Sequence, residues 1–419
     1  MDLLAGIKVL DFTLAAVGPF CSRILADMGA EVIRVEYPRE GMNPDGPTGR
    51  FTPEGLRADV LFIHCNGGKK SLAVNLKEMR GIELVWDLVK QVDVVVENFT
   101  PRVMRNFALD YDNLKARNPR IIMCSLTGFG QEGYDGDVTR PCTDPVAQAM
   151  SGLTWITGER NGAPYAIGGG IGDTITSLNG AIAILAALVS RNQTGVGQYI
   201  DLAMAEAAMF VDCTAMPYVA ANNGKSRIYR NGQANTYTYP MGPFKTKDGY
   251  VALQAPGFGP ASPWARLCEA MGRQDLVSKP EFLEDNVRAA NAPEVIKIIE
   301  GWLANFTRDE ALEKLAEARI SSGPVLSQAE ILEHRLFRSR GTFGTIHYPE
   351  LGDVKVVEPP FKFSDADAYV RGPAPQFGEH NHDVLERYLK LSKSEIEELT
   401  RTGVLYESDS ARLRNYAKK

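Results

Sequence analysis

The fold is decided by the stretch IKVLDFTLAAVGPFCSRILADMGAEVIRVE, residues 7–36. Its first six residues are mostly apolar and predict a buried strand, residues 20–28 predict a helix, and residues 31–36 predict a second buried strand. A strand, a helix and a strand in this order form a βαβ unit, whose strands are parallel and whose crossover is right-handed. The chain is therefore predicted to open with an α/β fold built on a parallel sheet.

Two parts of the chain invite comparison with dinucleotide-binding motifs, and neither fits such a motif in its sequence context. Glu36 ends the second strand as the ribose-binding acid of dinucleotide enzymes does, but residues 14–19 lack the glycine fingerprint, which counts against NAD. Residues 128–133, GFGQEG, match GxGxxG, but the following YDGD does not predict a helix. We interpret residues 128–133 as an active-site loop after a strand predicted at 120–126, because ligands bind at the carboxyl ends of parallel strands.

Residues 66–77, NGGKKSLAVNLK, combine glycines with lysines as phosphate loops do, although the spacing is not that of a Walker A motif. Two interpretations stay open for them, an anion site and a basic turn that enters a strand. His380 and His382 lie beside Glu379 and Asp383, which is a possible metal set. A solvated loop or helix start is the preferred interpretation, and we predict no metal site.

The composition is that of a soluble enzyme: 419 residues, 44% hydrophobic, 23% charged, and a formal net charge of -6. The acidic balance gives no sign of nucleic-acid binding, and no apolar run approaches a membrane span. The N-terminus lacks the pattern of a secretion signal. Six widely spaced cysteines without a CxxC pair argue against zinc and a disulfide scaffold, and fit a reducing cytoplasm.

Changes in composition predict the domain organisation. A large domain is expected over residues 1–221, a polar and tyrosine-rich linker over 222–245, and a small domain over 246–325. Residues 326–419 are expected to return to the large domain or to a partner chain.

A glycine-rich stretch ends in a single carboxylate at Asp173. Residues 166–173 are AIGGGIGD, and the apolar spacing after them predicts a helix with Asp173 as its N-cap. The carboxylate is then either a helix cap or a nucleophile. A helix N-terminus keeps a carboxylate ionised, and small neighbours let a bulky electrophile approach it.

These segments, taken in order, resemble the family III CoA-transferases, also called the CaiB/BaiF family, and the resemblance covers almost the whole chain. The residues that carry it are 4–11, 18–19, 26–36, 66–77, 97–101, 127–131, 172–173, 187–188, 194–198, 248–251, 267–273 and 378–381. The resemblance implies a Rossmann-like large domain, a smaller α/β domain and an interlocked homodimer. It also implies that Asp173 is the catalytic aspartate.

The implied reaction transfers CoA from an acyl-CoA donor to a carboxylic acid acceptor. Asp173 attacks the donor thioester to give a mixed anhydride, and CoA then attacks the aspartyl carbonyl to give an aspartyl-CoA thioester. The acceptor carboxylate reverses these steps. CoA and acyl-CoA act as co-substrates, and no permanently bound cofactor is expected.

The resemblance also supplies candidate site residues. Asp144 stands where oxalate-type relatives have a helping glutamate, and Gly257 and Gly259 match a glycine loop that covers the intermediate in relatives. The CoA contacts expected from motif positions or from charge are Ala16, Val17, Arg39, Val74, Asn75, Lys77, Asn98, Phe99, Arg102, Arg105 and Arg140.

Two departures suggest an acceptor other than a small dicarboxylate, namely a larger or more apolar acid. Some relatives have a glutamine in place of Ala16, and Asp144 is shorter than the glutamate of oxalate-type enzymes. An acyl-CoA racemase of the same fold is disfavoured because Thr143 replaces its catalytic histidine, although a CoA-ester isomerase would use the same aspartate. A nicotinamide oxidoreductase and a non-catalytic CoA-binding protein are the alternatives from other classes.

Overall fold

The computed structural model describes residues 1–37, 60–226, 228–234, 238–349 and 351–408. The chain divides into two compact units. The first contains residues 1–151, 167–213 and 336–419, and the second contains residues 152–166 and 214–335.

The first unit is built on a six-stranded parallel sheet with the strand order β3-β2-β1-β4-β5-β6. This order reverses direction between β1 and β4, which is the doubly wound pattern of Rossmann-like folds. The α/β class and the parallel opening βαβ unit are therefore confirmed. The strands are β1 (Lys8–Asp11), β2 (Glu31–Glu36), β3 (Lys70–Ala73), β4 (Val94–Glu97), β5 (Ile122–Thr127) and β6 (Tyr199–Ala203).

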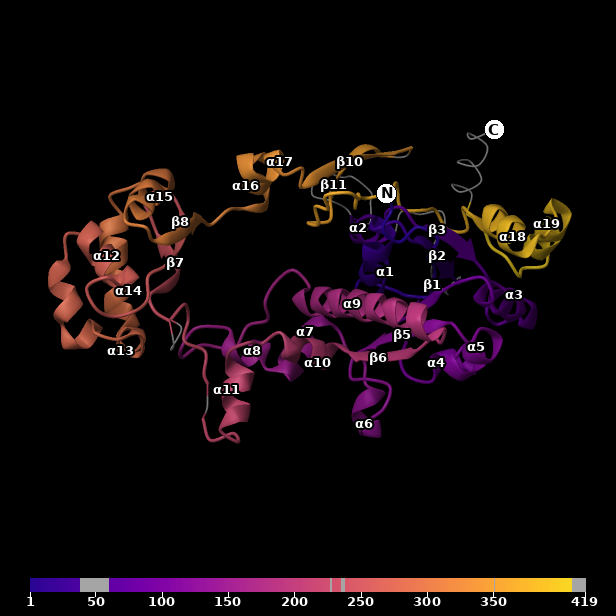
Figure 1. Ribbon diagram of the computed structural model, residues 1–419, viewed down its shortest axis with the longest axis horizontal. Coiled ribbons are helices and arrows are strands. Elements are labelled where there is room, and N and C mark those ends of the chain that lie inside the picture. Colours follow the sequence, from indigo (N-terminus) through magenta and orange to yellow (C-terminus); the bar gives the residue numbers. More distant parts are fainter. Residues whose placement is uncertain (38–59, 227, 235–237, 350, 409–419) are drawn as a thin grey trace. The chain divides into compact units, whose positions relative to one another are not determined.

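Helices cover both faces of this sheet because its strands are apolar on both sides. One face packs on α1 (Val17–Asp27) and α9 (Ile171–Thr194), and α9 lies along β5 and β6 (Figure 1). The other face packs on α3 (Met79–Val89), α5 (Tyr111–Arg117) and the closing helices α18 (Asn381–Leu389) and α19 (Lys393–Arg401).

The remaining elements of the first unit are short and surround the sheet. They are α2 (Val60–Asn66), α4 (Val103–Asn106), α6 (Asp135–Val138), α7 (Asp144–Ser151), α10 (Met204–Phe210), α17 (Arg335–Ser339) and the antiparallel pair β10 (Phe343–Tyr348) and β11 (Gly352–Val357). One difference from the sequence prediction concerns α6, since a single helical turn does follow the GFGQEG loop.

The packing of α9 differs from what its apolar spacing suggests. Gly180 and Ala181 face the core, and a Cβ atom on Gly180 would lie 2.9 Å from Leu126 and 3.0 Å from Cys21. In contrast, Leu178 and Ile182 are 40% and 64% exposed. The small residues of α9 face the sheet because they allow the helix to approach it closely. The larger apolar side chains then lie on the outer surface of α9.

By length and composition α9 would be able to cross a membrane, alone among the helices of the described residues. This corrects the expectation that no apolar run approaches the length of a membrane span. The same property belongs to core helices of soluble folds, and α9 packs on α1, α10 and β5.

The second unit has a three-stranded antiparallel sheet, β7-β8-β9, and its own apolar core around Trp264 and Phe244. Its strands are β7 (Met241–Lys245), β8 (Tyr250–Gln254) and β9 (Ser321–Pro324). Its helices are α8 (Leu153–Ile156), α11 (Ala215–Ala221), α12 (Pro263–Ala270), η1 (Gln274–Ser278), η2 (Pro280–Phe282), α13 (Asp285–Ala290), α14 (Ala292–Leu303), α15 (Arg308–Glu317) and α16 (Gln328–Glu333).

The unit boundaries differ from those expected from composition. Residues 152–166 and 214–221 group with the second unit, and the expected linker 222–245 includes β7. Residues 336–419 group with the first unit, where β3 residues contact α18.

Candidate active site

Asp173 lies in the first turn of α9, and it is not the N-cap. The N-cap is Gly170, whose φ of 66° lies in the left-handed region that glycine adopts easily. Asp173 is the third residue of the helix, and its side chain makes no capping hydrogen bond. The prediction of Asp173 as N-cap is therefore wrong, because the glycines let the helix begin three residues earlier.

Asp144 supplies the cap from another helix. Its Oδ1 accepts hydrogen bonds from the backbone N–H groups of Gly172, at 2.6 Å, and Asp173, at 3.3 Å. Residue 172 has to be small, since a Cβ atom there would lie 2.9 Å from the same oxygen. The N–H groups of the first turn are thus occupied by Asp144, and the Asp173 carboxylate remains available for other contacts.

The pKa of Asp173 is raised to about 6, first by burial and second by the negative charge of Asp144. Cys142, just before α7, is a further titratable neighbour, and burial together with the charge of Asp173 raises the pKa of its thiol. Asp173 is therefore ionised at neutral pH but more basic than an ordinary aspartate. A group with this combination is a stronger nucleophile than a solvated carboxylate.

The space around the glycines that precede Asp173 is open. Cβ atoms built on Gly168, Gly169 and Gly170 would meet no atom within 4 Å. A bulky substrate is not blocked by side chains along this stretch.

The loop after β1 lies against the start of α9. Ser177, one turn after Asp173, donates its hydroxyl to the carbonyl oxygens of Val17 and Asp173, at 2.6 and 2.8 Å. Ala16 is the N-cap of α1, and the preceding Ala15 has a φ of 60° that is uncommon for a residue with a side chain. Ala16 and Val17 are thus brought close to the helix that carries Asp173.

The loop after β4 is paired with the same region. Asn98 Nδ2 donates to the carbonyl oxygen of Leu14, and Asn98 Oδ1 accepts from its N–H group, both at 2.8 Å. The N–H group of Phe99 donates to Glu97 Oε2 at 2.8 Å. Since β1 and β4 flank the reversal of strand order, Asn98 and Phe99 lie where ligands bind in doubly wound sheets.

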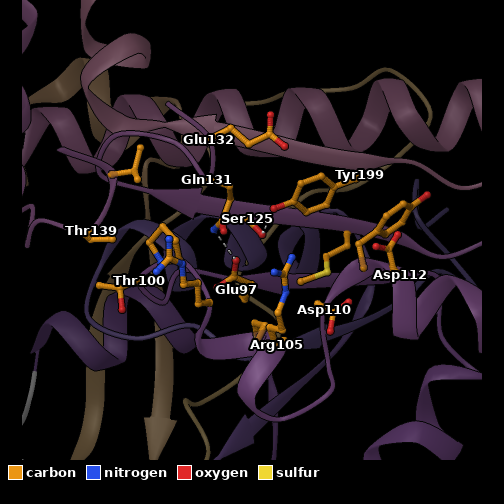
Figure 2. A pocket seen from close by; sticks show the side chains of 16 residues that line it. Glu97, Thr100, Arg105, Asp110, Asp112, Ser125, Gln131, Glu132, Thr139 and Tyr199 are labelled. Carbon is orange, nitrogen blue, oxygen red and sulfur yellow. Dashed lines mark hydrogen bonds between the residues drawn. The ribbon is translucent and has the colours of Figure 1, made fainter. Parts of the chain in front are cut away.

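A cavity of about 420 Å³ is lined by residues of β4, β5 and β6. Glu97, Ser125 and Tyr199 line it together with Arg102 and Arg105. In Figure 2, Gln131 is joined to Glu97 and Tyr199 is joined to Ser125, at 3.5 and 3.1 Å.

Burial changes the pKa values of Glu97 and Tyr199, which both line this cavity. Burial raises the pKa of Glu97 to about 7, against the opposing hydrogen bonds from Ser125 and the Phe99 N–H group. Burial also raises the pKa of Tyr199 to about 12. At pH 7 about half of the Glu97 carboxyl groups are therefore ionised, and Arg105, which also lines the cavity, is exposed.

Two of the three lysines of residues 66–77 pair with carboxylates. Lys69 is fully buried, with its Nζ 2.8 Å from Asp11 Oδ2, and Lys70 pairs with Glu31 and Asp383. The interpretation of this segment as a basic turn entering a strand is therefore favoured over an anion site. Glu36 likewise forms an ion pair with Arg34 and accepts a hydrogen bond from the hydroxyl of Ser71.

Four other residues that were expected to contact CoA are buried or make contacts within the protein. Val74 is fully buried, and the N–H group of Asn75 donates to the carbonyl oxygen of Val404 at 2.8 Å. Lys77 lies 5.6 Å from the Tyr37 ring centre, and Arg140 lies 5.9 Å from that of Phe129. Arg39 lies outside the described residues.

Gly257 and Gly259 belong to the second unit, in the loop between β8 and α12. Both have positive φ values, of 93° and 83°. The N–H group of Gly257 donates to Asp285 Oδ1, and its carbonyl oxygen accepts from Arg288. Phe258 between them is 77% exposed. The loop is thus fixed at its base and presents an aromatic ring at its tip.

Three features of the candidate site were not predicted from the sequence: the Glu97, Ser125 and Tyr199 group, the proximity of Cys142 to Asp173, and the contacts of Gln148 described below. The residues of each group are distant in sequence. The only local sign is the four-residue spacing of Asp144 and Gln148, which places them on one face of a helix.

A family model described as CoA-transferase family III matches residues 4–381, a span that includes β1, α7 and α9. The chain belongs to the family III CoA-transferases. It is therefore an enzyme with CoA-transferase activity, and the predicted family and enzyme class are confirmed.

Similar proteins agree with this assignment over nearly their whole lengths. The chain is 31% identical to the succinyl-CoA:glutarate CoA-transferase of Mus musculus, covering 98% of this chain and 92% of the relative. It is 32% identical to the succinyl-CoA–L-malate CoA-transferase beta subunit of Chloroflexus aurantiacus, with 96% and 98% covered. The crystal structure of a CaiB/BaiF family protein from Brucella suis matches with a TM-score of 0.78, at 32% identity, over 92% of this chain and 99% of that chain.

Proposed function

We propose that this CoA-transferase uses Asp173 as a covalent nucleophile that moves CoA from an acyl-CoA donor to a carboxylic acid. The observation that carries the proposal is a half-buried carboxylate of raised pKa that caps nothing and follows a stretch of glycines in the chain. A carboxylate needed only as a helix cap would hold the N–H groups of its own first turn, which Asp144 holds here.

The reaction proceeds by two acyl exchanges on Asp173. A side-chain oxygen attacks the thioester carbonyl of the donor, the carbon–sulfur bond breaks, and a mixed anhydride and CoA thiolate form. The thiolate attacks the aspartyl carbonyl and releases the donor acid as a carboxylate, which leaves an aspartyl-CoA thioester. The acceptor carboxylate then attacks this thioester, and the returning thiolate attacks the acceptor carbonyl to release the new acyl-CoA and the free Asp173 carboxylate.

CoA is proposed to bind along the loops after β1 and β4 and at the cavity of Figure 2. Ala16 and Val17 lie against α9, Asn98 pairs with Leu14, and Arg105 lines the cavity. Guanidinium groups match phosphate oxygens in charge and geometry, so we propose that Arg102 and Arg105 hold the phosphates.

The names of the similar proteins make succinyl-CoA the first donor to test and dicarboxylic acids such as glutarate and L-malate the first acceptors. The aliphatic Ala16 and the short Asp144 favour a larger or more apolar acid instead. A panel that contains both kinds of acceptor distinguishes these two proposals.

We further propose that the enzyme is a cytoplasmic homodimer of interlocked chains, in which the loop of Gly257 and Gly259 covers the aspartyl intermediate. The exposed apolar side chains of α9 and α10 support a dimer, since Ile182, Val189 and Phe210 are 64%, 61% and 78% exposed. Sedimentation velocity tests the dimer.

The decisive experiment is mass spectrometry of the protein after incubation with acyl-CoA, followed by hydroxylamine trapping and peptide mapping. An adduct on Asp173 is expected in the native protein and absent in Asp173→Asn. Asp309→Asn is a matched control, because Asp309 also lies in the first turn of a helix, α15. Measurable CoA binding without an adduct from any donor would overturn the proposed nucleophile.

A further inference from the structure

Gln148 occupies the centre of the hydrogen-bond network that joins α7 to the start of α9. It lies one turn after Asp144 on α7, and its side chain is fully buried. Its Nε2 donates to Asp144 Oδ2 at 2.8 Å and to the carbonyl oxygen of Ile167 at 3.0 Å. Its Oε1 accepts from the N–H group of Ile167 at 2.7 Å.

The orientation of this amide is fixed by its partners. The Ile167 N–H group can only donate, so it requires the amide oxygen, and the two remaining partners are acceptors that require the NH₂ group. One buried amide thereby uses both of its donors and its acceptor. A buried and satisfied polar network of this kind specifies a single arrangement of the groups that it joins.

Gln148 joins Asp144 to Ile167, and it acts differently on each of them. Asp144 must present Oδ1 to Gly172 and Asp173, and the hydrogen bond from Gln148 to Oδ2 holds the carboxylate in that orientation. The stretch 168–170 consists of three glycines with open space around their Cβ positions, so it has no side chains of its own to hold it. Ile167, which Gln148 binds through both backbone groups, is the residue directly before them.

We propose that Gln148 is the positioning residue of the reaction, which acts through Asp144 and Ile167 to fix the carboxylate of Asp173 for attack on the thioester. The inference rests on the proposed role of Asp173 as nucleophile. Gln148 hydrogen-bonds to Asp144 and Ile167 and not to Asp173, so its effect on the reaction is indirect.

Loss of this amide changes both the position and the charge environment of Asp173. Without the donor to Oδ2, Asp144 can rotate away from the first turn of α9, and the coulombic contribution of Asp144 to the pKa of Asp173 decreases. Cys142 and Arg140, which precede α7, and Glu206, in the first turn of α10, are further charged or titratable groups on or beside the elements that pack against α9. The first turn of α1 carries no charged side chain.

The test measures the rate of adduct formation on Asp173 in a single turnover from pH 4.5 to 8.5. Gln148→Met keeps the length of the side chain but cannot form these hydrogen bonds. We expect it to slow adduct formation by about 100-fold, as a displacement of about 1 Å in a reacting group does. We also expect the acid limb of its rate profile to shift to lower pH.

A double-variant cycle separates positioning from general packing. If Gln148 acts through Asp144, then adding Gln148→Met to Asp144→Ala should slow the reaction by less than about three-fold beyond Asp144→Ala alone, because the coupled partner is already absent. Additive losses, or an unchanged acid limb in Gln148→Met, would overturn the inference.

A reciprocal exchange keeps the inference testable if Gln148→Met folds poorly. Gln148→Glu places two carboxylates side by side and should slow adduct formation strongly. The combination Asp144→Asn/Gln148→Glu restores an amide–carboxylate hydrogen bond with its direction reversed. Its adduct should form at least about ten-fold faster than that of Gln148→Glu alone. No recovery would contradict the role of the Asp144 contact. Absence of an adduct in the native protein would instead overturn the proposed function itself.

Discussion

Asp144 accepts a hydrogen bond from the backbone N–H group of Asp173, although the two residues lie 29 positions apart in the chain. The carboxylate of Asp144 thereby caps the helix that presents the carboxylate of Asp173. This arrangement separates two roles that a single aspartate at a helix start usually combines. One carboxylate satisfies the backbone, and the other remains free to react.

The rate of adduct formation should depend on the ionisation of Asp173. Since only the carboxylate attacks, and its pKa is raised to about 6, the rate should fall by half near pH 6 and about ten-fold for each further pH unit below it. Stopped-flow release of CoA thiol from a donor across pH 4.5 to 8 measures this limb. A limb centred near pH 4 would show that burial and Asp144 do not perturb Asp173.

Asp173→Asn should abolish the reaction and at the same time stabilise the fold at neutral pH. A carboxyl whose folded pKa lies above its unfolded value contributes stability below about pH 4, and loses it as the pH rises through about 6. The group is half-exposed, so solvent screening reduces the effect at pH 7 to about 1 kcal/mol. Urea unfolding at pH 4 and pH 7 checks this, and equal stability of the two proteins at both values would contradict it.

Gly172→Ala should destabilise the fold by about 1 kcal/mol, because the added Cβ atom displaces the Asp144 carboxylate that lies 2.9 Å away. Gly168→Ala is the matched control in the same stretch, with open space at its Cβ position and no positive φ. The control should change the free energy of unfolding by less than about 0.5 kcal/mol. Equal effects of the two substitutions in urea unfolding would exclude the steric explanation.

Two adjacent lysines should differ sharply in their contribution to stability. Lys69→Met leaves the fully buried Asp11 without its ammonium partner and should cost about 3–5 kcal/mol. Lys70→Met removes partly exposed ion pairs and should cost no more than about 1 kcal/mol. Chemical denaturation of both variants measures the difference.

The same ion pair predicts a dependence on pH. Burial opposes ionisation of Asp11, but Lys69 and Arg34 outweigh it and hold the pKa of Asp11 at about 2. Asp11 therefore contributes stability above about pH 4, which is lost as the pH falls through about 2. This loss should be smaller in Lys69→Met, because Arg34 remains but Lys69 no longer lowers the pKa of Asp11.

Arg105→Ala should weaken CoA binding without changing the chemistry. The loss of one charge-assisted contact to a phosphate corresponds to a rise of about ten-fold in KM for the acyl-CoA, with kcat unchanged. Arg401→Ala, which removes an exposed arginine paired with Glu398, is the control. An unchanged KM in Arg105→Ala would remove the cavity of Figure 2 from the proposed CoA site.

Local pattern was sufficient for several features of the fold. Residues 7–36 predict the βαβ unit because strand and helix periodicity are properties of neighbouring residues. The helix after residue 170 follows from the same kind of signal. The first residue of this helix did not follow from local pattern, since both Gly170 and Asp173 are acceptable at an N-cap. Which of them is the N-cap depends on the hydrogen bond from Gly172 to Asp144.

The buried face of α9 also required the tertiary structure. Its spacing marks Leu178 and Ile182 as apolar, and both are exposed, whereas Gly180 and Ala181 face the core. Periodicity identifies an apolar stripe but not the surface that packs against it. Here the closeness of α9 to β5 and α1 favours the smallest residues over the most hydrophobic ones.

The sequence by itself determined the parallel α/β fold, the glycine-rich approach to Asp173 and, through ordered motifs, the family. Only the tertiary structure decided which individual side chains are buried and which partners they contact. Lys69 and Lys70 are neighbours of one residue type, yet one is buried against Asp11 and the other lies near the surface beside Glu31 and Asp383. Hydrogen bonds and ion pairs between residues far apart in the chain depend on distances in space, which the packing of the sheet and its helices sets.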